Sequence, residues 1–198
     1  MKHIFHKENL SNPTFLLLHG TGGDEKDLLA LAHFIQPNYN VLSVRGEVQE
    51  NGMNRFFKRL AEGVFDEEDL VYRTHQLKEF VDQAAIDYGF DRTKVVALGY
   101  SNGANIAASI LFHYADAFSK AILLHPMVPI RKELPDVSLV SVFIGAGKND
   151  PICPPEQSIQ LNELLTKAHA NVTLHWENNG HRISESELNA VKKWLNKE

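Results

Sequence analysis

The chain has 198 residues, enough for one domain in which helices cover both faces of a sheet. Its 43% hydrophobic and 23% charged residues are an ordinary balance for a globular protein and argue against a disordered chain. The formal net charge of −5 offers no basic surface for phosphate backbones, so nucleic-acid binding is not expected.

Short apolar runs alternate with helical patterns along the chain, which predicts an α/β fold with a mostly parallel sheet and crossover helices. Several runs are continuous Val, Ile and Leu, as expected of strands buried on both faces. The predicted strands, in chain order, are a weaker edge strand near His3–His6, then Thr14–Leu18, Asn40–Val44, Lys94–Leu98, Ala121–Leu124, Leu139–Ile144 and Val172–Trp176.

Helices are predicted between these strands, over Glu25–Ile35, Asn102–Tyr114 and Glu156–His169. A further helix has apolar residues at helical spacing, namely Leu70, Leu77, Val81, Ala84 and Tyr88, and Gly89 is placed to end it in the left-handed conformation. Ser184 and Glu187 form a capping-box pattern at the start of a last helix. We find no linker, so we expect one domain over residues 1–198, without a large separate lid domain.

Residues 46–69 depart from this regular alternation, because they form a long, polar and charged connection. Long connections in compact domains tend to be functional or disordered. The middle of this connection contains Arg55, Phe56 and Phe57. These residues favour a segment that lies across another part of the molecule, rather than a free loop. Two interpretations stay open: a surface excursion and a cover over the substrate site.

The strongest motif is Gly99-Tyr100-Ser101-Asn102-Gly103, where the strand Lys94–Leu98 meets the next helix. A serine on such a turn is held in a strained conformation with its hydroxyl exposed at the carboxyl end of the strand. The glycines are needed because side chains there would collide with the neighbouring strand and helix. The pattern alone arises by chance in roughly one chain in fifteen of this size, so its strand–turn–helix context carries the prediction.

A serine hydroxyl needs a base within hydrogen-bond reach, itself oriented by a carboxylate. Asp150 follows the strand Leu139–Ile144, and His181 follows the strand Val172–Trp176, so both are expected at the same sheet edge as Ser101. The order serine, acid, histidine is that of α/β hydrolases. We therefore predict a catalytic triad of Ser101, Asp150 and His181.

Other residues compete for these roles. Asp136 precedes its strand and so lies at the wrong edge, and His175 falls inside a strand. His125 follows the strand Ala121–Leu124 at the correct edge, where we expect it to line the pocket with Met127. The alternative interpretation of Asp150, which precedes Pro151, is an acidic residue that opens a turn and has no catalytic role.

An ester reaction also needs two donors for the oxyanion of its tetrahedral intermediate. One is expected to be the backbone N–H of Asn102, directly after the serine. The other should come from the turn His19-Gly20-Thr21-Gly22-Gly23, whose glycines let the backbone approach closely. The N–H of Thr21 is our choice, with Gly22 as the alternative.

The sequence offers little for a metal, a cofactor or a membrane. The ten histidines include no His-Glu-x-x-His pattern, and the single Cys153 has no paired cysteine. The glycine-rich segments lack the remaining residues of dinucleotide and P-loop motifs. With no apolar leader and no apolar run near the roughly 20 residues that span a bilayer, we expect a cytoplasmic protein without a membrane partner.

These motifs resemble the small carboxylesterase/phospholipase-type α/β hydrolases, close to acyl-protein thioesterases and dienelactone hydrolases. The matching pieces are Leu18–Gly23, Gly99–Gly103, Gly147–Pro154 and Gly180-His181. Residues 51–60 and 65–69 resemble a bacterial subgroup linked to hydroquinone and catechol stress. Ser101 stands where dienelactone hydrolases carry Cys, and Asn102 where the thioesterases usually carry Gln.

The resemblance implies an esterase that acts on small-molecule esters with short acyl or aryl groups, without metal or cofactor, and often as a homodimer. Gly22, Arg55, Phe56, His125 and Met127 are its candidate pocket residues. Three alternatives stay open: a dienelactone or ring-opening hydrolase, a metal- or thiol-dependent hydrolase, and a quinone- or lipid-binding protein with little or no catalysis.

Overall fold

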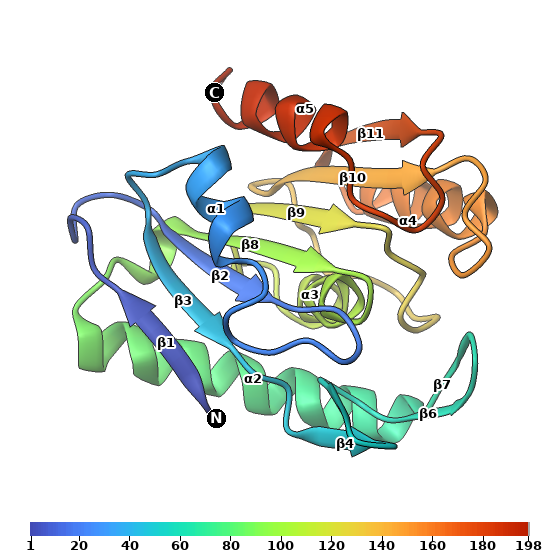
Figure 1. Ribbon diagram of the computed structural model, residues 1–198, viewed down its shortest axis with the longest axis horizontal. Helices are drawn as coiled ribbons and strands as arrows, with labels where there is room; N and C mark the ends of the chain where they lie inside the picture. The colour runs from blue at the N-terminus through green and yellow to red at the C-terminus, as the bar shows by residue number, and fades with distance from the viewer. Residues whose placement is uncertain (198) are drawn as a thin grey trace.

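The computed structural model describes residues 1–197 and has a seven-stranded sheet at its centre (Figure 1). In spatial order its strands are β1 (His3–His6), β3 (Asn40–Val44), β2 (Thr14–Leu18), β8 (Val95–Tyr100), β9 (Lys120–Leu124), β10 (Ser141–Gly147) and β11 (Asn171–Glu177). The edge strand β1 is antiparallel to β3, and every other neighbouring pair is parallel.

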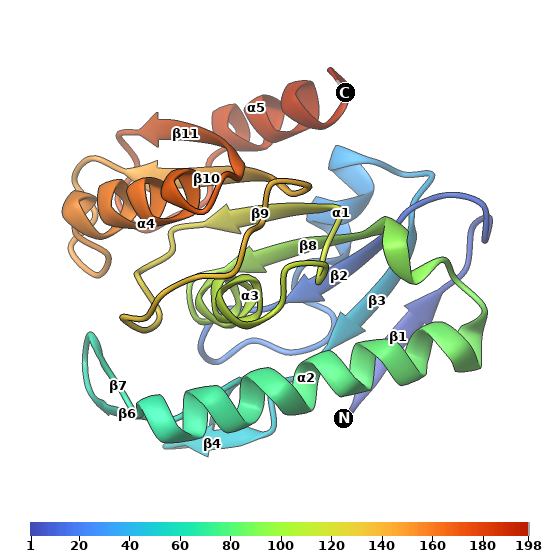
Figure 2. The same ribbon diagram turned by 180° about the vertical axis from the view of Figure 1, so that it is seen from behind.

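Helices cover both faces of the sheet (Figures 1 and 2). α1 (Leu29–Ile35) and α5 (Glu185–Leu195) lie on one face. α2 (Glu67–Tyr88), α3 (Asn102–His113) and α4 (Pro155–Lys167) lie on the other. This is the architecture of the α/β-hydrolase fold, and residues 1–197 include no separate lid domain. No helix in this range is long and apolar enough to cross a membrane.

The sheet separates two hydrophobic cores, and single strands contribute to both. In β2, Phe15 and Leu17 point to the core under α1 and α5, while Leu16 and Leu18 point to the core under α2, α3 and α4. All four side chains are fully buried. Successive side chains of a strand point to opposite faces, so a strand buried on both faces must be apolar throughout.

Helix α2 ends where its sequence predicts, and its start lies within the segment predicted to be a connection. Asp66 accepts a hydrogen bond from the Asp69 N–H at the start, and Gly89 ends the helix at φ 73°. Three acidic residues lie in the first turn, where the positive end of the helix dipole stabilises them. A left-handed residue at this position is favourable only without a Cβ, which explains the glycine.

The two predicted elements whose boundaries differ most from the structure are a helix and a strand. The helix predicted over Glu25–Ile35 begins only at Leu29, because Glu25 is buried and hydrogen-bonded to Arg45, which requires turns at this point. The strand predicted from Leu139 begins at Ser141 and continues to Gly147. Leu139 itself lies in a turn and is 91% exposed, so an apolar residue does not by itself mark a strand.

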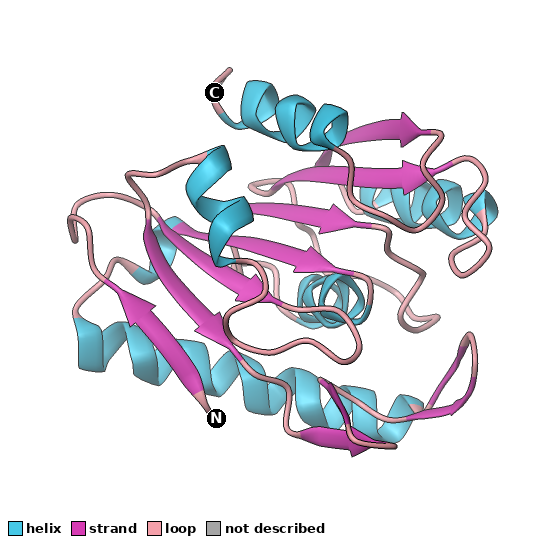
Figure 3. Cartoon of the chain, viewed as in Figure 1, coloured by secondary structure: helices cyan, strands magenta, loops and turns pink. Residues whose placement is uncertain are grey.

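The predicted connection over residues 46–69 forms two small hairpins that end at Phe65 (Figure 3), and its last residues, 67–69, are the first turn of α2. The first pairs β4 (Val48–Glu50) with β5 (Met53–Arg55), and the second pairs β6 (Arg59–Ala61) with β7 (Val64–Phe65). Strands of two or three residues are too short to show a hydrophobic period, so the sequence did not predict them.

Candidate active site

The carboxyl ends of the parallel strands meet at one edge of the sheet, and the polar residues of interest follow these ends. The turn at Thr21 follows β2, Ser101 follows β8 and His125 follows β9. Asp150 follows β10, and His181 follows β11. This edge is where ligands bind in open α/β sheets.

Ser101 occupies the turn between β8 and α3 in a conformation that few residues adopt, with φ 51° and ψ −113°. The two flanking glycines make this turn possible. A Cβ on Gly99 would lie 2.5 Å from the Gly103 carbonyl oxygen, and one on Gly103 would lie 1.9 Å from the Leu18 carbonyl oxygen. Backbone of this kind cannot shift away cheaply, so both positions require glycine.

Three side chains form a continuous chain of hydrogen bonds. Ser101 Oγ lies 2.9 Å from His181 Nε2, and His181 Nδ1 lies 2.7 Å from Asp150 Oδ2. An ionised carboxylate only accepts, so Nδ1 carries the proton and Nε2 is free to accept from the Ser101 hydroxyl. The Tyr100 hydroxyl donates to the His181 carbonyl oxygen at 2.7 Å and fixes this loop beside the serine.

Asp150 is buried but well supplied with donors. Its Oδ1 accepts the backbone N–H of Ile152 at 2.8 Å and of Cys153 at 2.9 Å. Burial alone would raise the pKa of Asp150, but the Cys153 amide, His181 and the Ile152 amide outweigh it and hold the pKa below the ordinary value. The carboxylate is therefore ionised at neutral pH.

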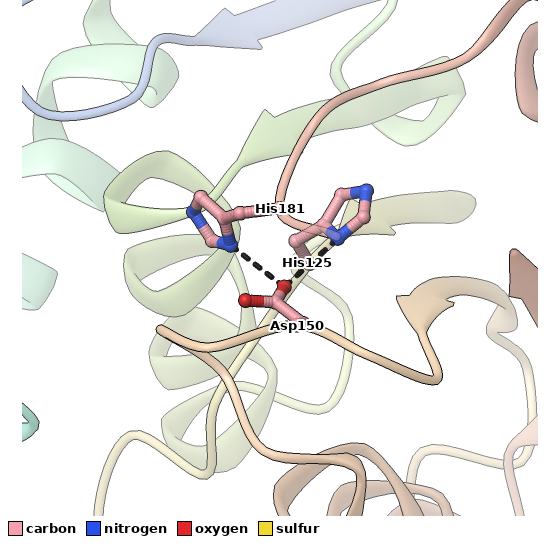
Figure 4. A group of neighbouring side chains, drawn as sticks. All are labelled: His125, Asp150 and His181. Carbon is pink, nitrogen blue, oxygen red and sulfur yellow. Dashed lines mark hydrogen bonds and ion pairs between the residues drawn. The ribbon is translucent and has the colours of Figure 1, made fainter. Parts of the chain in front are cut away.

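His125 is fully buried and does not line the cavity beside Ser101, which corrects the expected position of this residue. Its ring and the ring of His181 both contact Asp150 (Figure 4). Its Nδ1 lies 3.2 Å from Asp150 Oδ2, the same oxygen that binds His181. Its Nε2 lies 3.3 Å from Glu187 Oε2. The side chains of His125, Asp150 and Glu187 have no solvent exposure.

Two backbone N–H groups near Ser101 are available to a ligand. Asn102 is the first residue of α3, and an N–H in the first helical turn has no acceptor in the helix. The Thr21 N–H has no hydrogen-bond partner within residues 1–197. The alternative, Gly22, donates its N–H to the Asn54 carbonyl oxygen at 2.9 Å and is already engaged.

A cavity of about 290 Å³ opens beside the serine. Its wall includes Ser101 and His181, together with Met127 and, from the 46–69 segment, Arg55 and Arg59.

Three candidate pocket residues do not form this wall: Gly22, Phe56 and His125. Phe56 is buried against the His19 ring, with 4.7 Å between the ring centroids. Its N–H donates to Asn102 Oδ1 at 2.7 Å, so the 46–69 segment is fastened to the serine turn.

Cys153 is close to the site but is not placed to react. Its thiol is buried and donates to the His125 carbonyl oxygen at 3.3 Å. Burial, with a smaller effect of Asp150, raises the pKa of the thiol to about 12. A thiolate, the reactive form, is therefore scarce at neutral pH.

Sequence reasoning missed Glu187, which it assigned only to a capping box. The Glu187 N–H does donate to Ser184 Oγ at 3.0 Å, but the carboxylate turns inward to His125. A signal was present, because Glu187 lies four residues before Val191 and so shares the buried face of α5.

The phospholipase/carboxylesterase family matches residues 1–198. The protein "Putative hydrolase MhqD" of Bacillus subtilis (strain 168) is 55% identical over 195 residues, which are 98% of this chain and 97% of that protein.

Two solved structures are also similar. A carboxylesterase of Bacillus cereus has 58% identity and a TM-score of 0.98, over 100% of this chain and 94% of that one. A structure of YahD with malic acid has 33% identity and a TM-score of 0.93, over 99% of this chain and 98% of that one.

Proposed function

We propose that this chain, which belongs to the phospholipase/carboxylesterase family, hydrolyses carboxylic esters of small molecules with Ser101 as its nucleophile. The observation that carries the proposal is the unbroken hydrogen-bond chain from Ser101 through His181 to Asp150, at the wall of a cavity. The family supports an esterase, and this chain of hydrogen bonds supports the serine mechanism.

The proposed reaction proceeds in two halves. His181 Nε2 takes the hydroxyl proton as Ser101 Oγ attacks the ester carbonyl carbon, and the Thr21 and Asn102 N–H groups stabilise the resulting oxyanion. The C–O bond to the alcohol then breaks, and His181 returns its proton to the leaving oxygen. Water attacks the acyl-enzyme, gives its proton to His181, and the acid leaves as Ser101 regains its hydrogen.

The first test replaces the nucleophile. Ser101→Ala is expected to abolish hydrolysis of p-nitrophenyl acetate, because no other group near His181 can form the acyl-enzyme. Circular dichroism and the melting temperature should show a fold like that of the wild type. Full activity in this variant would contradict the proposal.

Two controls separate this mechanism from its rivals. Activity should survive a chelator and a thiol reagent, because the proposed mechanism uses neither a metal nor Cys153. It should be lost with a fluorophosphonate, which modifies activated serines. Stoichiometric binding of a quinone or lipid, with no turnover of any ester, would instead favour a binding protein.

A second candidate substrate class is an ester, or a lactone, that carries a second acidic group. Two cations, Arg55 and Arg59, line the cavity and share the single carboxylate of Glu50. Arg59 Nε lies 2.9 Å from Glu50 and Arg55 Nη1 lies 3.5 Å from it, and a second carboxylate, Glu62, also lines the cavity. The buried position of Arg55 beside the serine site, and not an excess of positive charge, favours a substrate with an acidic group. The structure of YahD with malic acid, a dicarboxylic acid, supports the same preference.

Arg55 is the residue to test. It is buried, and its Nη1 donates to Thr21 Oγ1 at 2.7 Å beside the proposed oxyanion donor. We expect 4-nitrophenyl hydrogen succinate to be favoured over 4-nitrophenyl butyrate, and Arg55→Met to reduce this kcat/KM ratio by about tenfold.

The matched control is Lys58→Met, an exposed cation of the same segment that does not line the cavity. Its ratio should stay that of the wild type. An equal loss on both substrates in Arg55→Met would assign Arg55 to holding the Thr21 turn and not to choosing the substrate.

A further inference from the structure

His125, the second histidine that contacts Asp150, has a combination of features that side-chain packing does not explain. His125 is fully buried, titratable and in the left-handed region at φ 53°. A non-glycine residue there is strained, and such strain persists only where surrounding contacts impose it. Here the His125 N–H donates to the Gly145 carbonyl oxygen at 2.7 Å, which fixes the residue directly behind Asp150.

Glu187 completes this arrangement from the opposite side. A buried carboxylate is unfavourable unless a partner compensates it, and its only side-chain partner within residues 1–197 is His125. The protein also leaves space for it, because a Cβ on Gly145 would lie 2.0 Å from Glu187 Oε1. The buried contact between His125 and Glu187 therefore joins the end of β9 to α5, beside Gly145 of β10.

The donor and acceptor capacity of the contacting atoms determines how protons are distributed among His181, Asp150, His125 and Glu187. Asp150 Oδ2 only accepts, so both His181 Nδ1 and His125 Nδ1 donate to it. The 3.3 Å contact between His125 Nε2 and Glu187 Oε2 then holds one proton, which either atom can carry. In both states the His125–Glu187 pair is neutral overall, and Asp150 is the anion.

We propose that His125 and Glu187 are positioning residues that extend the triad to five members. His125 holds the Asp150 carboxylate in the orientation that aligns His181, and Glu187 keeps the His125 proton on Nδ1. This inference rests on the proposed esterase function. The other groups in contact with His125 are the Tyr100 ring with its centroid at 6.0 Å, the His181 ring at 5.3 Å and the Cys153 thiol.

The test compares variants that keep or remove the hydrogen-bond donor from position 125 to Asp150. His125→Leu removes it, and kcat should fall by about 10- to 100-fold with KM within about twofold, because misorientation affects the chemical step and not the cavity. The acid limb of the kcat/KM profile should move to higher pH, because Asp150 no longer divides its charge between two rings. His125→Asn, whose amide can donate to Asp150 and which tolerates positive φ, should recover most of kcat.

Glu187 supplies the matched pair of controls. Glu187→Gln, the conservative variant, can still donate to His125 Nε2 and should retain most of kcat, whereas Glu187→Leu should resemble His125→Leu. All rates are measured well below the melting temperature of each variant, so that an effect on kcat is separated from a loss of stability. Wild-type kcat and pH profile in His125→Leu would overturn the inference, while an inactive wild type would overturn the proposed function instead.

Discussion

Two strained residues lie side by side at the candidate site, Ser101 at φ 51° and His125 at φ 53°, each at the end of a neighbouring strand. Backbone hydrogen bonds hold both conformations: the Ser101 N–H donates to the Leu124 carbonyl oxygen, and the His125 N–H donates to the Gly145 carbonyl oxygen. Strain of this kind concentrates at functional sites, since the sheet behind it supplies the stability that the turns lack.

The titration of His125 leads to a prediction about stability. Burial lowers its pKa, but hydrogen bonds and charges of Glu187 and Asp150 outweigh burial, so the pKa lies above its ordinary value of 6.5. A raised pKa in the folded state contributes stability that is complete below the unfolded value and is lost as pH rises through the folded value. We therefore expect the wild type's advantage in unfolding free energy over His125→Leu to shrink as pH rises above about 6.5.

Urea denaturation of both proteins at several pH values measures this difference, and the other histidines cancel in the comparison. A difference that stays constant with pH, or grows as pH rises, would contradict the predicted sign.

At the scale of elements, much of the fold could be predicted because buried parallel strands are continuous apolar runs. The bounds of β1, β2 and β3 agree with the predicted ranges, and the other four predicted strands are shifted by one to three residues. Since a strand's carboxyl end fixes which edge the following loop occupies, the sequence also predicts that Ser101, Asp150 and His181 meet.

The rest of the site could not be predicted because it depends on side-chain direction. Glu187 fits a capping box, and its turn toward His125 is set by the space at Gly145, a residue far away in the chain. His125 lies at the expected edge, but an edge position does not determine whether a ring faces the cavity or the core. Phe56 is apolar and near the site, yet its ring packs on His19.

At the scale of the whole molecule, the wall of the cavity is shared by the loops at the carboxyl edge of the sheet and the 46–69 segment. Figure 1 shows the hairpins of this segment near that edge. We propose that this segment is the cover over the substrate site, because Arg55, Arg59 and Phe65 contribute to the cavity wall. The cytoplasmic location and the homodimer stay predictions from the sequence and the resemblance.

The central claim is that an ester transfers its acyl group to Ser101, and mass spectrometry of the intact protein tests it most directly. After rapid acid quenching of a reaction with p-nitrophenyl acetate, the protein should gain the mass of one acetyl group, and peptide mapping should place it on Ser101. The acetyl group should be absent from Ser101→Ala. Turnover without any acyl adduct, or an adduct on Cys153 instead, would contradict the account.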